Sequence, residues 1–342
     1  MKQQGLSNLW IGSSQIAFRP GRDEIGLAAD ADPLEAHDVV VLDGPSQTLR
    51  LAYRASHRHS ALFLTNRCNS NCLMCSQPPT RHDDSWLVSE ALAIVRHMSE
   101  PPRTLGLTGG EPTLLGPVLP RLLVQLRSEL PSTQFEILSN GRALEDPKYV
   151  AELAEAGQGS VSWLVPLYGH ADFLHDYVVQ APGAFEQTLM GLLNLRDCAQ
   201  AIQLRIVLIE PVLSHLTELC GYIARNLRFV REVALMACEP IGFALANKAQ
   251  CSVNLTDWHQ TLADGVDALS GVGVRTVIMN APRCALPREL WRFAARSISD
   301  WKQVYADKCG ECVERESCSG LFAWHERGWT PAPIRPVLSK TI

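Results

Sequence analysis

The sequence predicts an α/β fold, a partial (β/α)6 barrel of the TIM type with a small N-terminal segment and a C-terminal cysteine-rich region. From about residue 60, apolar runs of strand length alternate with amphipathic stretches of helix length. This alternation is typical of βαβ units that build a buried parallel sheet. Six units are too few for a closed barrel of eight and suit a curved, partly closed one.

Polar residues and glycines follow the ends of most predicted strands, where parallel α/β folds gather their chemistry. The predicted strands are 61–66, 104–109, 134–140, 160–169, 201–209 and 231–237. The predicted helices are 86–99, 115–129, 147–156, 184–199, 214–227 and 255–269.

We divide the chain into four parts. Residues 1–57 form a partly β N-terminal segment, and residues 58–270 form the barrel core. Residues 271–328 form an auxiliary cysteine-rich domain. Residues 329–342 form a proline-rich tail, which we expect to be extended or mobile.

Composition excludes several classes of protein. Apolar residues make up 46% and charged residues 20% of the 342 positions, which is ordinary for a soluble globular chain. The formal net charge of -5 gives no basic field for nucleic acid or an anionic membrane. No apolar stretch has transmembrane length, and the N-terminus is a poor secretion signal. We therefore expect a cytoplasmic protein with no nucleic-acid or membrane partner.

Eleven cysteines are many for such a chain, and seven of them lie in two groups. A disulfide framework suits small secreted chains better, so metal ligation is favoured. The first group is Cys68-x3-Cys72-x2-Cys75. Structural zinc usually takes four protein ligands. A [4Fe-4S] cluster on three cysteines would instead leave one iron open to a ligand that is not protein.

This spacing after the first strand, followed by "LTGGEPT" (107–113) after the second, resembles the radical S-adenosylmethionine (SAM) superfamily. The resemblance implies that Cys68, Cys72 and Cys75 hold a [4Fe-4S] cluster and that SAM ligates its fourth iron. Reduction would then cleave SAM to a 5'-deoxyadenosyl radical, which abstracts hydrogen from a substrate.

The resemblance also assigns residues to SAM. Glycines in the GGEP turn let a backbone approach a ligand closely, whereas on its own the turn could be an ordinary strand-to-helix connection. The family often has an aromatic residue before the third cysteine, where this chain has methionine. The assigned residues are Met74, Gly109, Gly110, Glu111, Pro112, Ser139 and Asn140.

The second group is Cys284, followed after 24 residues by Cys309-x2-Cys312-x5-Cys318. Four cysteines complete a ligand set, and their spacing fits either structural zinc or an auxiliary [4Fe-4S] cluster. The group resembles the twitch extension of radical SAM peptide maturases, which favours the auxiliary [4Fe-4S] cluster over zinc.

Flanking residues carry a finer resemblance. "CLMCSQPP" (72–79), the run at 235–247 and the C-terminal cysteine pattern are similar to the C-type radical SAM maturases of His-Xaa-Ser systems. The resemblance covers about residues 60 to 325. It implies a ribosomally made precursor peptide or protein as substrate, a second radical SAM maturase as partner, and a reductant such as flavodoxin or ferredoxin.

Three further residues are candidates for catalysis. Tyr168 and His170 follow the fourth predicted strand and Glu239 follows the sixth, where they could contact substrate or transfer a proton; ordinary packing with satisfied hydrogen bonds is the alternative. Two other functions stay open. One is a radical SAM enzyme for a small metabolite or cofactor, and the other is a zinc-binding interaction protein.

Overall fold

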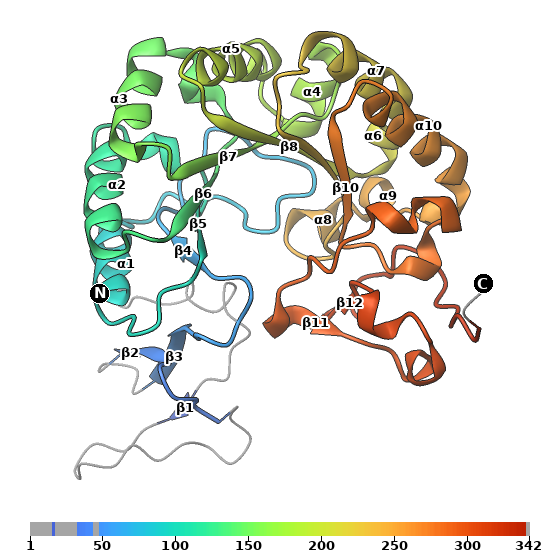
Figure 1. Ribbon diagram of the computed structural model, residues 1–342, viewed down its shortest axis with the longest axis horizontal. Helices are drawn as coiled ribbons and strands as arrows, with labels where there is room; N and C mark the ends of the chain where they lie inside the picture. The colour runs from blue at the N-terminus through green and yellow to red at the C-terminus, as the bar shows by residue number, and fades with distance from the viewer. Residues whose placement is uncertain (1–15, 18–32, 44–47, 340–342) are drawn as a thin grey trace.

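The computed structural model describes residues 16–17, 33–43 and 48–339. Its main sheet has seven parallel strands in the order β10-β9-β8-β7-β6-β5-β4. Because the spatial order follows the chain and β4 and β10 remain edges, the sheet curves without closing (Figure 1). The strands are β4 (Ala61–Phe63), β5 (Thr104–Thr108), β6 (Gln134–Leu138), β7 (Val161–Pro166), β8 (Ala201–Leu208), β9 (Glu232–Ala237) and β10 (Arg275–Met279).

This architecture confirms the predicted partial TIM-type barrel, and all six predicted strands are present. Strand β10 was not predicted. It pairs in parallel with β9 from Arg275 to Met279, so the sheet continues into the range assigned from sequence to the auxiliary domain.

Helices cover the convex face of the sheet (Figure 1). The six predicted helices correspond to α1 (Trp86–Arg96), α2 (Val118–Glu129), α3 (Pro147–Gly157), α5 (Ala184–Asp197), α7 (Leu216–Asn226) and α10 (His259–Ser270). The residues at the N-terminus of helix α3 show why the helix begins there. The Asp146 carboxylate caps the helix by accepting from the amide of Lys148 at 2.9 Å, and proline occupies the first helical position.

Four short helices were not predicted, and they lie beyond the carboxyl ends of β7, β8 and β9. They are α4 (Asp172–Val179), α6 (Glu210–Leu213), α8 (Phe243–Ala246) and α9 (Lys248–Cys251). Two of these, α4 and α8, take part in the cysteine site described below.

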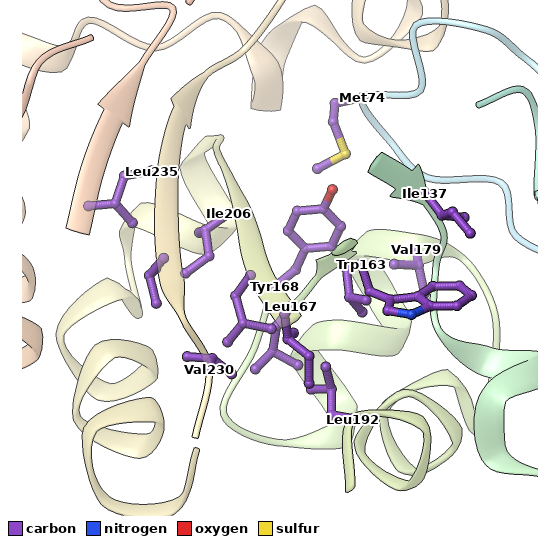
Figure 2. Close-up of a cluster of buried hydrophobic side chains, with 14 of the residues drawn as sticks. Met74, Ile137, Trp163, Leu167, Tyr168, Val179, Leu192, Ile206, Val230 and Leu235 are labelled. Atoms are coloured by element: carbon purple, nitrogen blue, oxygen red, sulfur yellow. The ribbon is translucent and has the colours of Figure 1, made fainter. Parts of the chain in front are cut away.

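The core lies between the sheet and its helices. In β8 the even-numbered side chains are buried and the odd-numbered ones are half-buried, so one face packs outward and the other faces the barrel interior. Figure 2 shows Ile206 of β8 with Leu235 of β9 and Val230 in this packed layer. Trp163 and Ile137 continue the layer on the neighbouring strands and are fully buried.

Smaller units flank the barrel at each end of the chain (Figure 1). Strands β1 (Ile16–Ala17), β2 (Val39–Asp43) and β3 (Thr48–Tyr53) form an antiparallel sheet, as a partly β segment requires. Strands β11 (Gln303–Val304) and β12 (Leu321–Phe322) pair within the cysteine-rich region. The described part of the tail, 329–339, has no regular element and docks on the barrel: Ala332 is buried, and the carbonyl of Pro331 accepts from the amide of Leu255 at 2.7 Å.

Candidate functional site

The first cysteine group lies on the loop after β4, which elements from across the barrel hold in place. The amides of Asn71 and Leu73 donate to the carbonyls of Val179 and Val178, at the end of α4, at 3.0 and 2.9 Å. The amide of Phe243, the first residue of α8, donates to the carbonyl of Cys75 at 2.8 Å. Cys68, Cys72 and Cys75 are all half-buried free thiols.

The Gly-Gly-Glu turn after β5 joins this loop backbone to backbone. The amides of Gly110 and Glu111 donate to the carbonyls of Thr65 and Arg67 at 2.7 and 2.8 Å. A Cβ on Gly109 would collide with the Thr65 backbone, and one on Gly110 would collide with the carbonyl of Arg67. The close approach that these glycines permit is therefore to the cysteine loop itself. Their contact with SAM stays a prediction.

Glu111 ties the ends of β5 and β6 together from a fully buried position. Its Oε1 accepts from the amide of Thr113 at 3.0 Å, the hydroxyl of Thr113 at 2.6 Å and the hydroxyl of Ser139 at 2.8 Å. Its Oε2 accepts from the amide of Asn140 at 2.6 Å. Burial raises the pKa of Glu111, and these four donors oppose the rise. Pro112 begins the short 3-10 turn that Glu111 caps.

Asn140 links the residues assigned to SAM with the cysteines. Its Nδ2 donates to Oδ1 of Asn69 at 2.6 Å and lies 3.9 Å from Sγ of Cys68. The structure thus brings the cysteine loop, the Gly-Gly-Glu turn and the Ser-Asn turn to one rim of the sheet, as the strand-end pattern predicts.

Met74 and Tyr168 occupy the barrel side of the same loop. Both are buried, and Figure 2 shows the hydroxyl end of Tyr168 pointing toward Met74. Burial raises the pKa of Tyr168 well above its usual value, and the nearby thiols of Cys72 and Cys75 add to the rise. The Tyr168 ring stacks on His175 with centroids 6.0 Å apart.

The other two catalytic candidates have protein neighbours of their own. The ring of His170 contacts those of Phe173 and His215 at centroid distances of 6.0 and 5.9 Å. Its buried Nδ1 finds no hydrogen-bond partner among the described residues. The Glu239 carboxylate pairs with Nζ of Lys302 at 3.1 Å, which joins the end of β9 to the cysteine-rich region. Catalytic roles for these residues stay predictions.

The thiols of the first group suit a metal centre in their chemistry. Burial raises the pKa of Cys68 to about 11 and that of Cys72 further. Such thiols stay protonated at neutral pH unless a metal displaces the protons. Within the described ranges, no three His, Cys, Asp or Glu side chains converge as a single metal ion would require. A [4Fe-4S] cluster places each thiolate on a separate iron.

The second cysteine group surrounds one pocket. Cys284, Cys309, Cys312 and Cys318 all line a partly open space of about 410 Å³, although Cys284 is distant in sequence. Apolar wall residues come from three segments: Pro282, Leu321, Ile334, Pro336 and Val337. Four thiols around one largely apolar pocket would suit a [4Fe-4S] cluster, in which each thiolate binds a separate iron; a metal centre here stays a prediction.

Backbone amides point at the sulfurs of this pocket. Sγ of Cys318 accepts from the amides of Arg283 and Gly320 at 3.4 and 3.5 Å. Sγ of Cys312 accepts from the amide of Val337 at 3.4 Å. Burial raises the pKa of Cys284, and a backbone hydrogen bond from Arg335 opposes the rise. Donors to sulfur stabilise thiolates and tune iron–sulfur centres, so these residues fit an auxiliary cluster.

Sequence analysis missed the residues that brace the two sites. The Asn247 side chain donates to the carbonyl of Leu73 at 2.9 Å, and Arg142 donates to the carbonyl of Asn69. The tail residues around Val337 were also missed. Each of these contacts spans distant parts of the chain, so no local pattern could have revealed it.

Part of the barrel matches a known protein family. The family model of the radical SAM superfamily matches residues 62–212. The match covers less than half of the chain, and over these residues the chain is similar to that superfamily. The similarity supports the expected [4Fe-4S] cluster and SAM, which are taken up as a proposal below. None of the curated proteins compared matches the chain.

Solved structures are similar to this chain at low sequence identity. "Native anSMEcpe with bound AdoMet and Cp18Cys peptide" has a TM-score of 0.50 and 16% identity, and the match covers 64% of this chain and 63% of that one. Methylornithine synthase (PylB) has a TM-score of 0.48 and 12% identity, and the match covers 65% of this chain and 64% of that one. A radical SAM methyltransferase from Sphaerobacter thermophilus has a TM-score of 0.44 and 15% identity, and the match covers 64% of this chain and 64% of that one. The chain thus spans under two thirds of the length of these structures.

The described helices include none that is both long and apolar enough to cross a membrane. The expected cytoplasmic location stays a prediction.

Proposed function

We propose that this radical SAM protein cleaves SAM reductively at a [4Fe-4S] cluster and uses the resulting radical chemistry to modify a ribosomally made peptide or protein. The observation that carries the proposal is the backbone junction between the cysteine loop and the Gly-Gly-Glu turn, with Asn140 beside Cys68. It supports the proposal because it brings the three cysteines and the residues assigned to SAM to one rim.

Cys68, Cys72 and Cys75 would hold the cluster, and Cys284, Cys309, Cys312 and Cys318 would hold the auxiliary [4Fe-4S] cluster. When bound, the first cluster and SAM would supply one-electron cleavage of a carbon–sulfur bond. The chain supplies position: Glu111 orients Ser139 and the amide of Asn140, while Met74 and Tyr168 keep the barrel side of the loop apolar.

Two observations support a peptide or protein substrate. The four-cysteine pocket resembles the extension found in peptide maturases, and the structure with a TM-score of 0.50 is named as holding AdoMet and a peptide. Maturation of the His-Xaa-Ser type, with a second radical SAM maturase and a flavodoxin or ferredoxin as reductant, is the most specific form of the proposal.

The test is metal analysis followed by SAM cleavage, on protein purified without oxygen. About eight irons per chain, falling to about four in the Cys68/Cys72/Cys75 triple alanine variant, would support two [4Fe-4S] clusters. The parent should then form 5'-deoxyadenosine with a chemical reductant, and the variant should not. Zinc alone, after failed reconstitution with iron and sulfide, would refute the radical enzyme and leave a zinc-binding interaction protein.

Substrate class is tested in the same assay. A peptide with His-Xaa-Ser repeats should stimulate 5'-deoxyadenosine formation and itself change mass, whereas the same peptide with histidine and serine replaced by alanine should not change mass. Cleavage that no precursor peptide alters, but that a small metabolite stimulates, would contradict the peptide substrate and favour the alternative.

A further inference from the structure

The described part of the C-terminal tail crosses the four-cysteine pocket. We call residues 334–337 the strap, and all four of them line the pocket. The strap is held at both ends. Before it, Ala332 is buried in the main core and Pro331 accepts from Leu255 at the start of the turn before α10. At its far end, the carbonyl of Val337 accepts from the amide of Val313 at 2.9 Å.

The strap also reaches one of the four sulfurs by a hydrogen bond. The amide of Val337 donates to Sγ of Cys312 at 3.4 Å, and Arg335 lines the same pocket as Cys284. Because Val313 follows Cys312 directly, Val337 contacts consecutive residues through both its amide and its carbonyl. This pairing fixes the register of the strap on the cysteine segment.

We infer that the strap belongs to the four-cysteine site and helps to retain its bound metal, because the amide of Val337 donates to a sulfur and the strap closes one wall of the pocket against water. The inference rests on the proposed auxiliary metal site. It adds a role for the tail, which neither the cysteine spacing nor the radical SAM domain assigns.

The charges of the pocket agree with this role. The wall residues include three arginines and one glutamate: Arg283, Arg315, Arg335 and Glu314. Arg283 forms an ion pair with Glu314. Four thiolates around a metal centre carry net negative charge, and positive groups in a partly buried wall offset it. The strap contributes Arg335 to that set.

The test uses full-length protein that carries the Cys68/Cys72/Cys75 triple alanine change, so that only the C-terminal site binds metal. Val337→Pro removes one amide hydrogen and retains the chain length and the carbonyl. Leu338→Pro is the matched control, because Leu338 is exposed and its amide has no hydrogen bond to a described residue. The measurement is the rate of iron and zinc release to a coloured chelator without oxygen.

Val337→Pro should release metal about fivefold faster than the parent, the effect of losing one ordinary hydrogen bond. Leu338→Pro should stay within about twofold. If the metal is a [4Fe-4S] cluster, Val337→Pro should also lower its reduction potential, because donors to sulfur stabilise the more negative reduced state. Equal release rates in the two proline variants would overturn the inference.

A second pair of variants keeps the test decisive if proline perturbs folding. A chain ending at residue 332 lacks the strap, whereas a chain ending at residue 339 retains it. The shorter chain should bind metal weakly or release it more than tenfold faster. Normal retention without the strap would refute the strap's role while leaving the auxiliary site intact. A parent that binds neither iron nor zinc would instead refute the auxiliary site, and the strap's role with it.

Discussion

Replacement of Glu111 by glutamine tests how the rim of the parallel sheet is built. The carboxylate accepts a fixed backbone amide on each oxygen, from Thr113 on Oε1 and from Asn140 on Oε2. A glutamine side chain has one oxygen and one NH2 group. Whichever way the amide is turned, its NH2 group therefore faces a backbone N–H.

The cost follows from these contacts. Loss of one hydrogen bond to a charged group costs roughly 1.5–3 kcal/mol, and the stranded buried donor adds about 1–3 kcal/mol. Burial of a neutral amide in place of a carboxylate recovers part of this, because burial alone disfavours the charged form of Glu111. We expect Glu111→Gln to lower the free energy of unfolding by about 3 kcal/mol.

Urea unfolding, followed by intrinsic tryptophan fluorescence, measures the change. Glu129→Gln is the control, because Glu129 forms only an exposed ion pair with Arg96 and should cost under about 1 kcal/mol. A loss below 1 kcal/mol for Glu111→Gln would refute the reasoning, since the carboxylate could not then be holding both backbone donors.

Three further predictions concern the same rim. Burial lowers the pKa of His175 to about 4, below the usual value near 6.5. Because the unfolded chain binds the proton first as the pH falls, the free energy of unfolding should fall by about 3 kcal/mol from pH 6.5 to pH 4. In a profile of urea midpoint against pH, His175→Asn should flatten this part of the curve. Gly110→Ala forces a Cβ into the carbonyl of Arg67, so it should cost more than about 2 kcal/mol, measured by thermal unfolding; an unchanged midpoint would show that the turn can move. Asn247→Ala removes the bond to Leu73 and should cost about 1 kcal/mol while it speeds alkylation of the cysteine loop; an unchanged alkylation rate would argue against this brace.

The sequence was most informative where the pattern is local. Apolar runs located six strands because each strand is short, continuous and buried against helices. The cysteine spacings pointed to two sites, and the second group does line one pocket. Strand β10 escaped because "VRTVIM" (274–279) carries Arg275 and Thr276 at its start and lies after the sixth helix. The sequence therefore placed these residues in the auxiliary domain, 271–328.

Features that depend on distant contacts could not be predicted. The sequence assigned Glu111 to SAM, whereas the structure shows that hydrogen bonds within the protein occupy both carboxylate oxygens. The tail was expected to be extended or mobile, because prolines disfavour regular elements. Its docking depends on one buried alanine and on backbone bonds to residues far away. Composition carries no information about such partners.

The bracing of the cysteine loop also has a consequence for biosynthesis. The loop begins near residue 65, yet Phe243 and Asn247 hold it through bonds to Cys75 and Leu73. The bond from Asn247 spans 174 positions of the chain, and contacts of such long range form late in folding. While the ribosome is still making the first half of the protein, the loop lacks the hydrogen bonds from Phe243 and Asn247. Loading of the proposed cluster onto a finished loop would therefore wait until nearly three quarters of the chain, through Asn247, has been translated and folded.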